Sequence, residues 1–104
     1  MTADQEFDRI AAGLLGAGAR AGAMFGKRAL LVGGKAFACL KGDALAFRLG
    51  AGSREHTTAL GLPGAALFDP SGKGRPFKDW VALPVTEATH WPDLAERALH
   101  AALG

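Results

Sequence analysis

Apolar residues near the start of the chain recur at the spacing of an amphipathic helix. The positions are Phe7, Ile10, Ala11, Leu14 and Leu15. This i, i+3, i+4, i+7, i+8 spacing predicts a helix that begins near Thr2 or Asp4. Three glycines follow between residues 16 and 22. Because glycine destabilises a helix interior by about 1 kcal/mol relative to alanine, we expect a loop over residues 16–24.

Three apolar runs come next, over residues 28–32, 35–41 and 44–49, separated by Gly33-Gly34 and Gly42-Asp43. Two-residue loops that contain glycine match the twist of antiparallel strands, so we predict a three-stranded meander. If Val32 pairs with Lys35 and Lys41 with Ala44, one face is wholly apolar and is the expected core. Its members are Ala29, Leu31, Ala36, Ala38, Leu40, Leu45, Phe47 and Leu49.

The second face of this meander is mixed, and we expect it to face solvent or a partner. It collects Arg28, Leu30, Val32, Lys35, Phe37, Cys39, Lys41, Ala44, Ala46 and Arg48. The cations and Phe37 could bind a nucleic acid, with phosphates along the cations and a base stacked on the aromatic ring. The alternative is that these cations keep an open antiparallel face soluble and discourage edge pairing.

The second half of the chain predicts a helix over residues 54–60 capped by Ser53, a strand over 65–68, a turn-rich run over 69–74 and a strand over 77–83. Apolar spacing from Trp91 to Leu103 predicts a terminal helix. The order α-βββ-α-ββ-α predicts one α+β domain over residues 1–104, a two-layer α/β sandwich with an antiparallel sheet and helices on one face. We expect five buried positions in particular: Leu31, Leu40, Phe47, Leu94 and Leu99.

Composition agrees with a globular domain and excludes several classes of protein. The chain is 49% apolar and 21% charged, which argues against disordered, collagen-like and membrane classes. Acidic residues occupy the N-terminus where a signal peptide would be basic, and no apolar run approaches about 20 residues, so we expect a cytoplasmic protein. Cys39 is the only cysteine, which excludes an internal disulfide and a Cys-x-x-Cys site.

Charge is segregated along the chain although the net charge is only +2. Residues 20–54 hold seven basic groups and one acidic group, which suggests a basic central surface. A second candidate surface follows the turn-rich run, where Arg75 precedes Phe77 and Trp80. Arginine and aromatic residues are enriched at binding hot spots. The alternative is that Trp80 covers the core with Arg75 along its ring.

Catalytic and metal-binding patterns are not recognisable in this sequence. The three histidines, His56, His90 and His100, are expected to be scattered over the surface with no cysteine or carboxylate at metal-ligand spacing. The run Ser71-Gly72-Lys73-Gly74 lacks the spacing and the following helix of a phosphate-binding loop. We therefore expect no catalytic residue, no metal and no cofactor, and a protein that is not an enzyme.

Three stretches carry a family resemblance: Met24-Phe25-Gly26, Gly33-Gly34-Lys35-Ala36-Phe37-Ala38, and Gly74-Arg75-Pro76-Phe77 leading to Trp80 and Pro84. Together they resemble the N-terminal domain of the TfoX/Sxy family. The resemblance implies a two-layer fold shared with secretion-chaperone-like proteins. The chain departs from many members at Gly22, where they have arginine, and at Lys27, where they have glycine.

The competence regulators of that family also carry a C-terminal domain, whereas this chain ends at Gly104, directly after its last expected helix. We therefore expect a stand-alone domain. The leading hypothesis is a non-enzymatic interaction or regulatory module that acts through a protein partner or self-association. The alternative is an accessory nucleic-acid-binding protein that uses the basic sheet face, and the third is a small enzyme.

Overall fold

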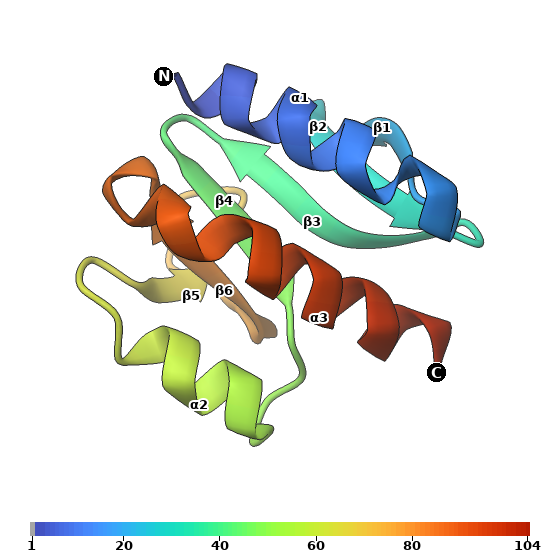
Figure 1. Ribbon diagram of the computed structural model, residues 1–104. Helices are drawn as coiled ribbons and strands as arrows, with labels where there is room; N and C mark the ends of the chain where they lie inside the picture. The colour runs from blue at the N-terminus through green and yellow to red at the C-terminus, as the bar shows by residue number, and fades with distance from the viewer. Residues whose placement is uncertain (1) are drawn as a thin grey trace.

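The computed structural model describes residues 2–104 as one six-stranded antiparallel sheet with three α-helices (Figure 1). The elements in chain order are α1 (Ala3–Leu14), the 3-10 helix η1 (Leu15–Ala17), β1 (Arg20–Met24), β2 (Lys27–Val32), β3 (Lys35–Lys41), β4 (Ala44–Arg48), α2 (Arg54–Leu60), β5 (Ala66–Phe68), β6 (Phe77–Pro84), the 3-10 helix η2 (Val85–His90) and α3 (Trp91–Leu103). The spatial order of the strands is β1-β2-β3-β4-β6-β5. The predicted α+β sandwich is confirmed.

Side-chain caps start two of the helices where the sequence predicted them. The Thr2 hydroxyl accepts from the Gln5 N–H at 3.1 Å, and the Gln5 side chain accepts from the Thr2 N–H at 2.9 Å, forming a capping box. The Ser53 hydroxyl accepts from the N–H of His56 at 3.1 Å. These bonds satisfy N–H groups that have no partner within the first helical turn.

The predicted meander is present, but a strand precedes it where we predicted a loop. Gly33 and Gly34 have φ of 56° and 80°, as a two-residue turn between antiparallel strands requires. The loop prediction over residues 16–24 is wrong from Arg20 onward, because β1 pairs antiparallel with β2. Alanine and glycine give β1 no alternating pattern, so pairing with β2 and not intrinsic propensity makes it a strand.

A β-bulge overturns part of the predicted assignment of faces. Leu31 pairs with Ala36 and Leu30 with Ala38, which leaves Phe37 as an extra residue in β3. Beyond the bulge every side chain of β2 points to the opposite face from the one predicted. Leu30, Val32 and Phe37 are therefore buried against the helices, while Ala29, Leu31 and Ala36 lie on the other side of the sheet.

The main core lies between the sheet and the helices α1 and α3 (Figure 1). Four of the five positions predicted to be buried are buried there: Leu40, Phe47, Leu94 and Leu99. Leu31 is only half-buried because of the bulge. The indole N–H of Trp91 donates to the Leu83 carbonyl at 3.2 Å, which satisfies the one polar atom of a fully buried ring.

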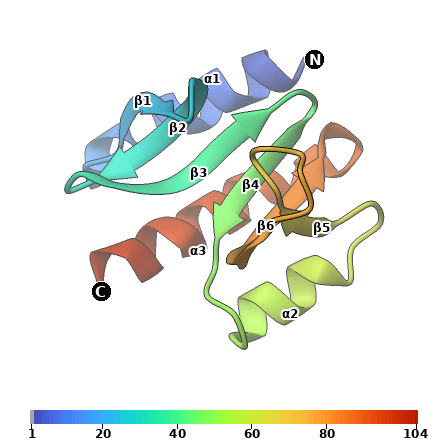
Figure 2. The ribbon, with the colours of Figure 1, turned by 180° about the vertical axis from the view of Figure 1, so that it is seen from behind.

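A second, smaller apolar cluster lies on the opposite face of the sheet. Its buried members are Cys39, Ala46, Phe68 and Trp80. The segment between β5 and β6 crosses this face, as the view from behind shows (Figure 2). The face opposite to α1 and α3 is therefore partly covered, and the uncovered part forms the candidate site. Among residues 2–104, no helix is long and apolar enough to cross a membrane.

Candidate interaction groove

The turn between β1 and β2 places an aromatic side chain in an unusual position. Phe25 and Gly26 form a two-residue loop with φ of 53° and 71°. Phe25 is the only non-glycine residue among residues 2–104 with positive φ. This left-handed conformation costs an ordinary L residue about 1–2 kcal/mol. The residue is nevertheless 61% exposed, so burial does not offset that cost.

The loop between β5 and β6 is held in shape by one carboxylate. Asp69 Oδ1 accepts from the Ser71 hydroxyl and the Gly72 N–H, both at 3.0 Å. Asp69 Oδ2 accepts from the N–H groups of Gly74 at 2.7 Å and Arg75 at 3.2 Å. Desolvation acts to raise the pKa of Asp69, but the hydrogen bonds outweigh it and the pKa is lowered.

The same loop is fixed to the sheet by a cation of β3. The Lys41 ammonium donates to the backbone carbonyl of Asp69 at 2.7 Å. Gly72 and Gly74 have φ of 69° and 78°, so the two tight bends need glycine. The loop therefore has a defined shape before any ligand binds, and it holds Arg75 and Phe77 beside the β1–β2 turn.

An aromatic row connects the exposed turn to the buried cluster. The ring centroids of Phe25 and Phe77 are 5.7 Å apart, those of Phe77 and Phe68 are 6.2 Å apart, and those of Phe68 and Trp80 are 5.7 Å apart. All three pairs are tilted or edge-to-face, the arrangements that aromatic rings prefer. The row begins at exposed Phe25 and ends at buried Trp80.

Beside this row lies an apolar groove of about 430 Å³, which we call the Phe25–Phe77 groove. It is lined by Phe25, Lys27, Pro70, Ser71, Arg75 and Phe77. Neither Lys27 nor Arg75 belongs to any ion pair in the part of the chain that the structure describes. The groove thus combines exposed aromatic surface with two cations that have no carboxylate partner.

The predicted basic platform on the sheet is not formed. The Arg28 guanidinium lies on the helix side, where it pairs with Asp8 and Asp4 of α1 and sits 4.4 Å from the centroid of the Phe7 ring. The hydrogen bonds that the guanidinium donates to both carboxylates, that to Asp8 first, raise the pKa of Arg28. Phe37 is fully buried among the core residues because of the bulge. An aromatic ring in the core cannot stack on a nucleic-acid base.

The other cations of that platform either lie on the opposite side of the sheet or already contact a polar group of the protein. Lys35 pairs with Val32 at the tip of the β2–β3 hairpin, on the helix side of the sheet. Only Lys41 and Arg48 lie on the opposite face as predicted. Lys41 donates to the Asp69 carbonyl, and Arg48 is 3.9 Å from the Asp79 carboxylate. The face therefore offers no row of free cations along its strands.

The structure brings together two of the stretches singled out in the sequence. Met24, Phe25 and Gly26 form the β1–β2 turn and its approach, while Gly74, Arg75 and Phe77 approach that turn from the β5–β6 loop. Two alternatives were open for Trp80, an exposed surface shared with Arg75 or a position covering the core; the residue is buried, at the inner end of the aromatic row. Sequence reasoning missed the partnership of Phe25 with Phe77, because nothing local indicates that the loop folds back over the sheet.

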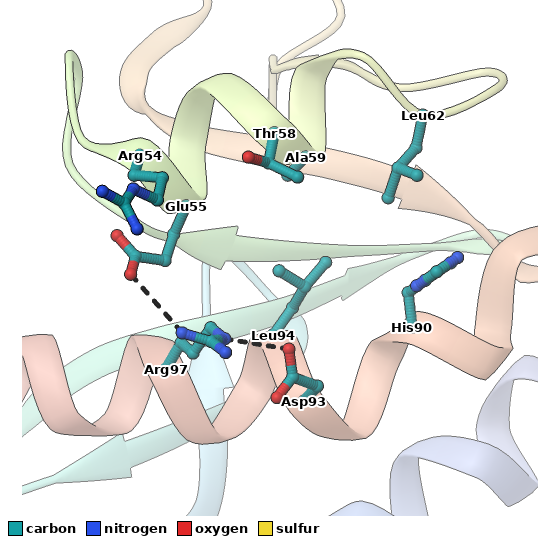
Figure 3. Close-up of a pocket in the computed structure, with 9 residues that line it drawn as sticks. All are labelled: Arg54, Glu55, Thr58, Ala59, Leu62, His90, Asp93, Leu94 and Arg97. Atoms are coloured by element: carbon teal, nitrogen blue, oxygen red, sulfur yellow. Dashed lines mark hydrogen bonds and ion pairs between the residues drawn. The ribbon is translucent and has the colours of Figure 1, made fainter.

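A second groove, of about 310 Å³, lies between α2 and α3 (Figure 3). Arg97 lies between Asp93 at 2.9 Å and Glu55 at 3.5 Å, so one cation joins the two helices. The hydrogen bond with Asp93 is the main reason that the pKa of Arg97 is raised. Leu62 and Leu94 contribute apolar surface to the lining of this groove. Because the two carboxylates and Arg97 satisfy one another, this groove presents weaker recognition chemistry than the first.

The side chains that could act as a nucleophile, a base or a metal ligand are either buried or far from one another. Burial raises the pKa of the Cys39 thiol although the nearby Lys27 acts to lower it, which disfavours the nucleophilic thiolate. His56 is buried and not on the surface as predicted, and its Nε2 lies 2.7 Å from the Lys78 carbonyl. Within residues 2–104, no three His, Cys, Asp or Glu side chains are grouped to hold a metal ion.

Comparison of the chain with protein-family models, curated proteins and solved structures finds no match.

Proposed function

We propose that the protein is a non-enzymatic interaction module and that the Phe25–Phe77 groove binds a segment of a partner protein. The observation that carries this proposal is the conformation of Phe25, which is both strained and 61% exposed. A strained backbone at an exposed aromatic residue lowers stability and is retained where it serves binding. An Asn-Gly turn would connect the same strands with less strain.

Charge complementarity indicates the chemistry of the partner segment. Lys27 and Arg75 border the groove and have no carboxylate partner among the described residues. Asp69, the acidic group of the adjacent loop, already accepts four hydrogen bonds within that loop. The groove therefore fits an acidic segment that inserts one apolar or aromatic side chain between Phe25 and Phe77.

Membership in the TfoX/Sxy N-terminal domain family is part of this proposal. Two of the stretches that carry the resemblance, Met24-Phe25-Gly26 and Gly74-Arg75-Pro76-Phe77, supply three of the six residues that line the groove. A shared binding surface would explain why these residue types occur together. A regulatory role in the cytoplasm, through a protein partner, is the form of this function that we favour.

Nucleic acid is the second candidate, because aromatic rings beside cations also bind single strands. The sheet-face platform first proposed for it is absent, since Phe37 is buried and Arg28 pairs with α1. Only Lys27 and Arg75 remain beside the exposed rings. Two cations neutralise few phosphates, so we favour the protein partner.

Peptide display separates these possibilities. A random peptide library is selected on the wild-type protein, and the enriched peptides are titrated by fluorescence anisotropy. We expect glutamate and aspartate around one aromatic or aliphatic residue, and a loss of affinity of about 30-fold or more in Phe25→Ala and in Arg75→Glu. The matched controls are Leu103→Ala, another exposed apolar residue, and Arg54→Glu, another exposed cation, which should leave the affinity unchanged.

Three outcomes contradict the proposal. The selection enriches no acidic peptide, the Phe25 and Leu103 variants lose the same affinity, or a single-stranded oligonucleotide binds more tightly than any peptide with an affinity that falls steeply as salt rises. The last outcome identifies nucleic acid as the ligand.

A further inference from the structure

The two edges of the sheet differ in how well they are protected against pairing with another chain. β5 is a three-residue edge strand with an irregular register against β6, and Pro63 and Pro70 lie close to its ends. Short length, bulges and proline are the devices by which proteins block an edge. β1 has five residues and pairs with β2 in unbroken register. It contains no proline, lysine or acidic residue.

The single cation of β1 does not protect that edge. The guanidinium of Arg20 donates back to the carbonyls of Ala19 at 2.9 Å and Leu15 at 3.4 Å, just before the strand. Ala21, Gly22 and Ala23 are all exposed. Ala21 and Ala23 pair with residues on the helix side of the sheet, yet α1 does not cover them. The edge is thus a flat strip of small residues.

The hairpin geometry shows which backbone groups are free. Met24 and Lys27 flank a two-residue turn, so they form a hydrogen-bonded pair, and the pairs alternate along the strand. Gly22 is then bonded to Ala29 of β2, while Ala21 and Ala23 direct their N–H and C=O groups away from the sheet. β1 therefore presents two donors and two acceptors to a neighbouring strand.

We infer that β1 pairs antiparallel with β1 of a second copy of this chain, about a two-fold axis at Gly22. The sequence Ala21-Gly22-Ala23 is the same in both directions, so Ala21 of each copy meets Ala23 of the other and all four outward N–H groups are bonded. The two glycines form the close pair, with Cα atoms about 4.5 Å apart. A methyl group at Gly22 would lie 2.7 Å from Leu31 Cδ1, so any side chain at this centre would require the leucine side chain to shift.

Charge permits this register. Arg20 of one copy lies opposite Met24 of the other, and the nearest cation, Lys27, is one strand further away. Strands are about 4.8 Å apart, so the backbones of Arg20 and of the other copy's Lys27 are separated by roughly 10 Å, and no two cations lie directly opposite each other. Leu15, 55% exposed just before the strand, adds apolar surface beside the paired edges. The result is one continuous twelve-stranded sheet.

Light scattering and amide hydrogen exchange test this inference on the full chain. From about 10 µM to about 1 mM, the range in which a small interface dissociates, we expect the mass to rise toward twice that of the monomer. In the same range, the Ala21 and Ala23 amide hydrogens should exchange at least tenfold more slowly, while that of Gly22, bonded in both states, changes little.

The variant Ala23→Pro removes one outward N–H and none of the bonds to β2, a placement that edge strands tolerate. It should remain monomeric throughout, while the control Ala23→Ser, which keeps the N–H, should dimerise as the wild type does. A wild-type monomer at all concentrations overturns the inference, and so does a dimer that the proline does not weaken. If the proline variant fails to fold, fast exchange of the Ala21 and Ala23 amides in a wild-type dimer overturns it.

Discussion

Substitutions of Phe25 separate the strain of its backbone from the role of its ring. Phe25→Ala removes the ring but leaves a Cβ atom in the left-handed region, where φ is 53°. Phe25→Asn removes the same ring, but asparagine tolerates this region and forms the favoured Asn-Gly turn with Gly26. Neither variant retains the contact with Phe77 at 5.7 Å. The difference in unfolding free energy between the two variants therefore measures the cost of the left-handed backbone conformation at position 25.

The magnitudes follow from these two contributions. Loss of a tilted aromatic pair costs about 0.5–1.5 kcal/mol, so Phe25→Ala should lower the free energy of unfolding by about that amount. Phe25→Asn should recover about 1 kcal/mol of it through relief of strain, which leaves its stability close to that of the wild type. In a domain of about 100 residues, 1 kcal/mol corresponds to roughly 4 °C in Tm.

Urea denaturation and thermal unfolding measure this difference, and peptide titration of the same samples measures binding. Both variants should lose the affinity for acidic peptides equally, although only one of them loses stability. Equal stability of the alanine and asparagine variants would show that the turn is not strained. Retention of affinity by Phe25→Asn would show that the ring is not the binding element.

Three further substitutions or conditions test other parts of the structure. Leu99→Ala should lower the free energy of unfolding by about 2–5 kcal/mol because this side chain of α3 is fully buried in the main core, and a change below about 0.5 kcal/mol in urea denaturation contradicts that packing. Arg28→Ala should cost about 1 kcal/mol, since its pairs with α1 are solvent-exposed, and the loss should shrink in high salt, whereas a salt-independent loss would point to packing on Phe7. The pKa of Asp69 is lowered from 3.8 in the folded protein, so its contribution to the order of the loop is complete above that pH and lost as pH falls through the lowered pKa. In the wild type, the amides of Gly74 and Arg75, followed by NMR, should stay protected from exchange until the pH falls below the ordinary Asp value of 3.8. In Asp69→Ala these amides should be unprotected at every pH.

Local chemistry made most of the elements predictable. Gly33-Gly34 and Gly42-Asp43 code for tight turns, and Ser53 caps a helix, so three strands and α2 could be placed from sequence. β1 could not, because alanine and glycine carry no alternation and the strand depends on its pairing with β2. The side of the sheet on which Phe37 lies could not be predicted either. A one-residue bulge has no local sequence signal, yet it reverses the face of every side chain beyond it.

The candidate site was predictable only in parts. Met24-Phe25-Gly26 and Gly74-Arg75 were both singled out, but their contact depends on the path of the β5–β6 loop. That path is set by hydrogen bonds from several backbone N–H groups to Asp69 and by the bond of Lys41 to the Asp69 carbonyl. The participating residues are separated by up to 34 positions in the chain, and spacing rules do not reach that far.

The most direct test of the Phe25–Phe77 groove is an NMR titration of the wild-type protein with a synthetic probe peptide, one phenylalanine flanked on both sides by glutamates. Matched peptides with alanine in place of phenylalanine, or lysine in place of glutamate, serve as controls. We predict saturable shift changes at the amides of Phe25, Lys27, Arg75 and Phe77 with the first peptide, and much smaller ones with either control. Changes centred on Arg97 between α2 and α3, or equal changes with all three peptides, would contradict the proposal.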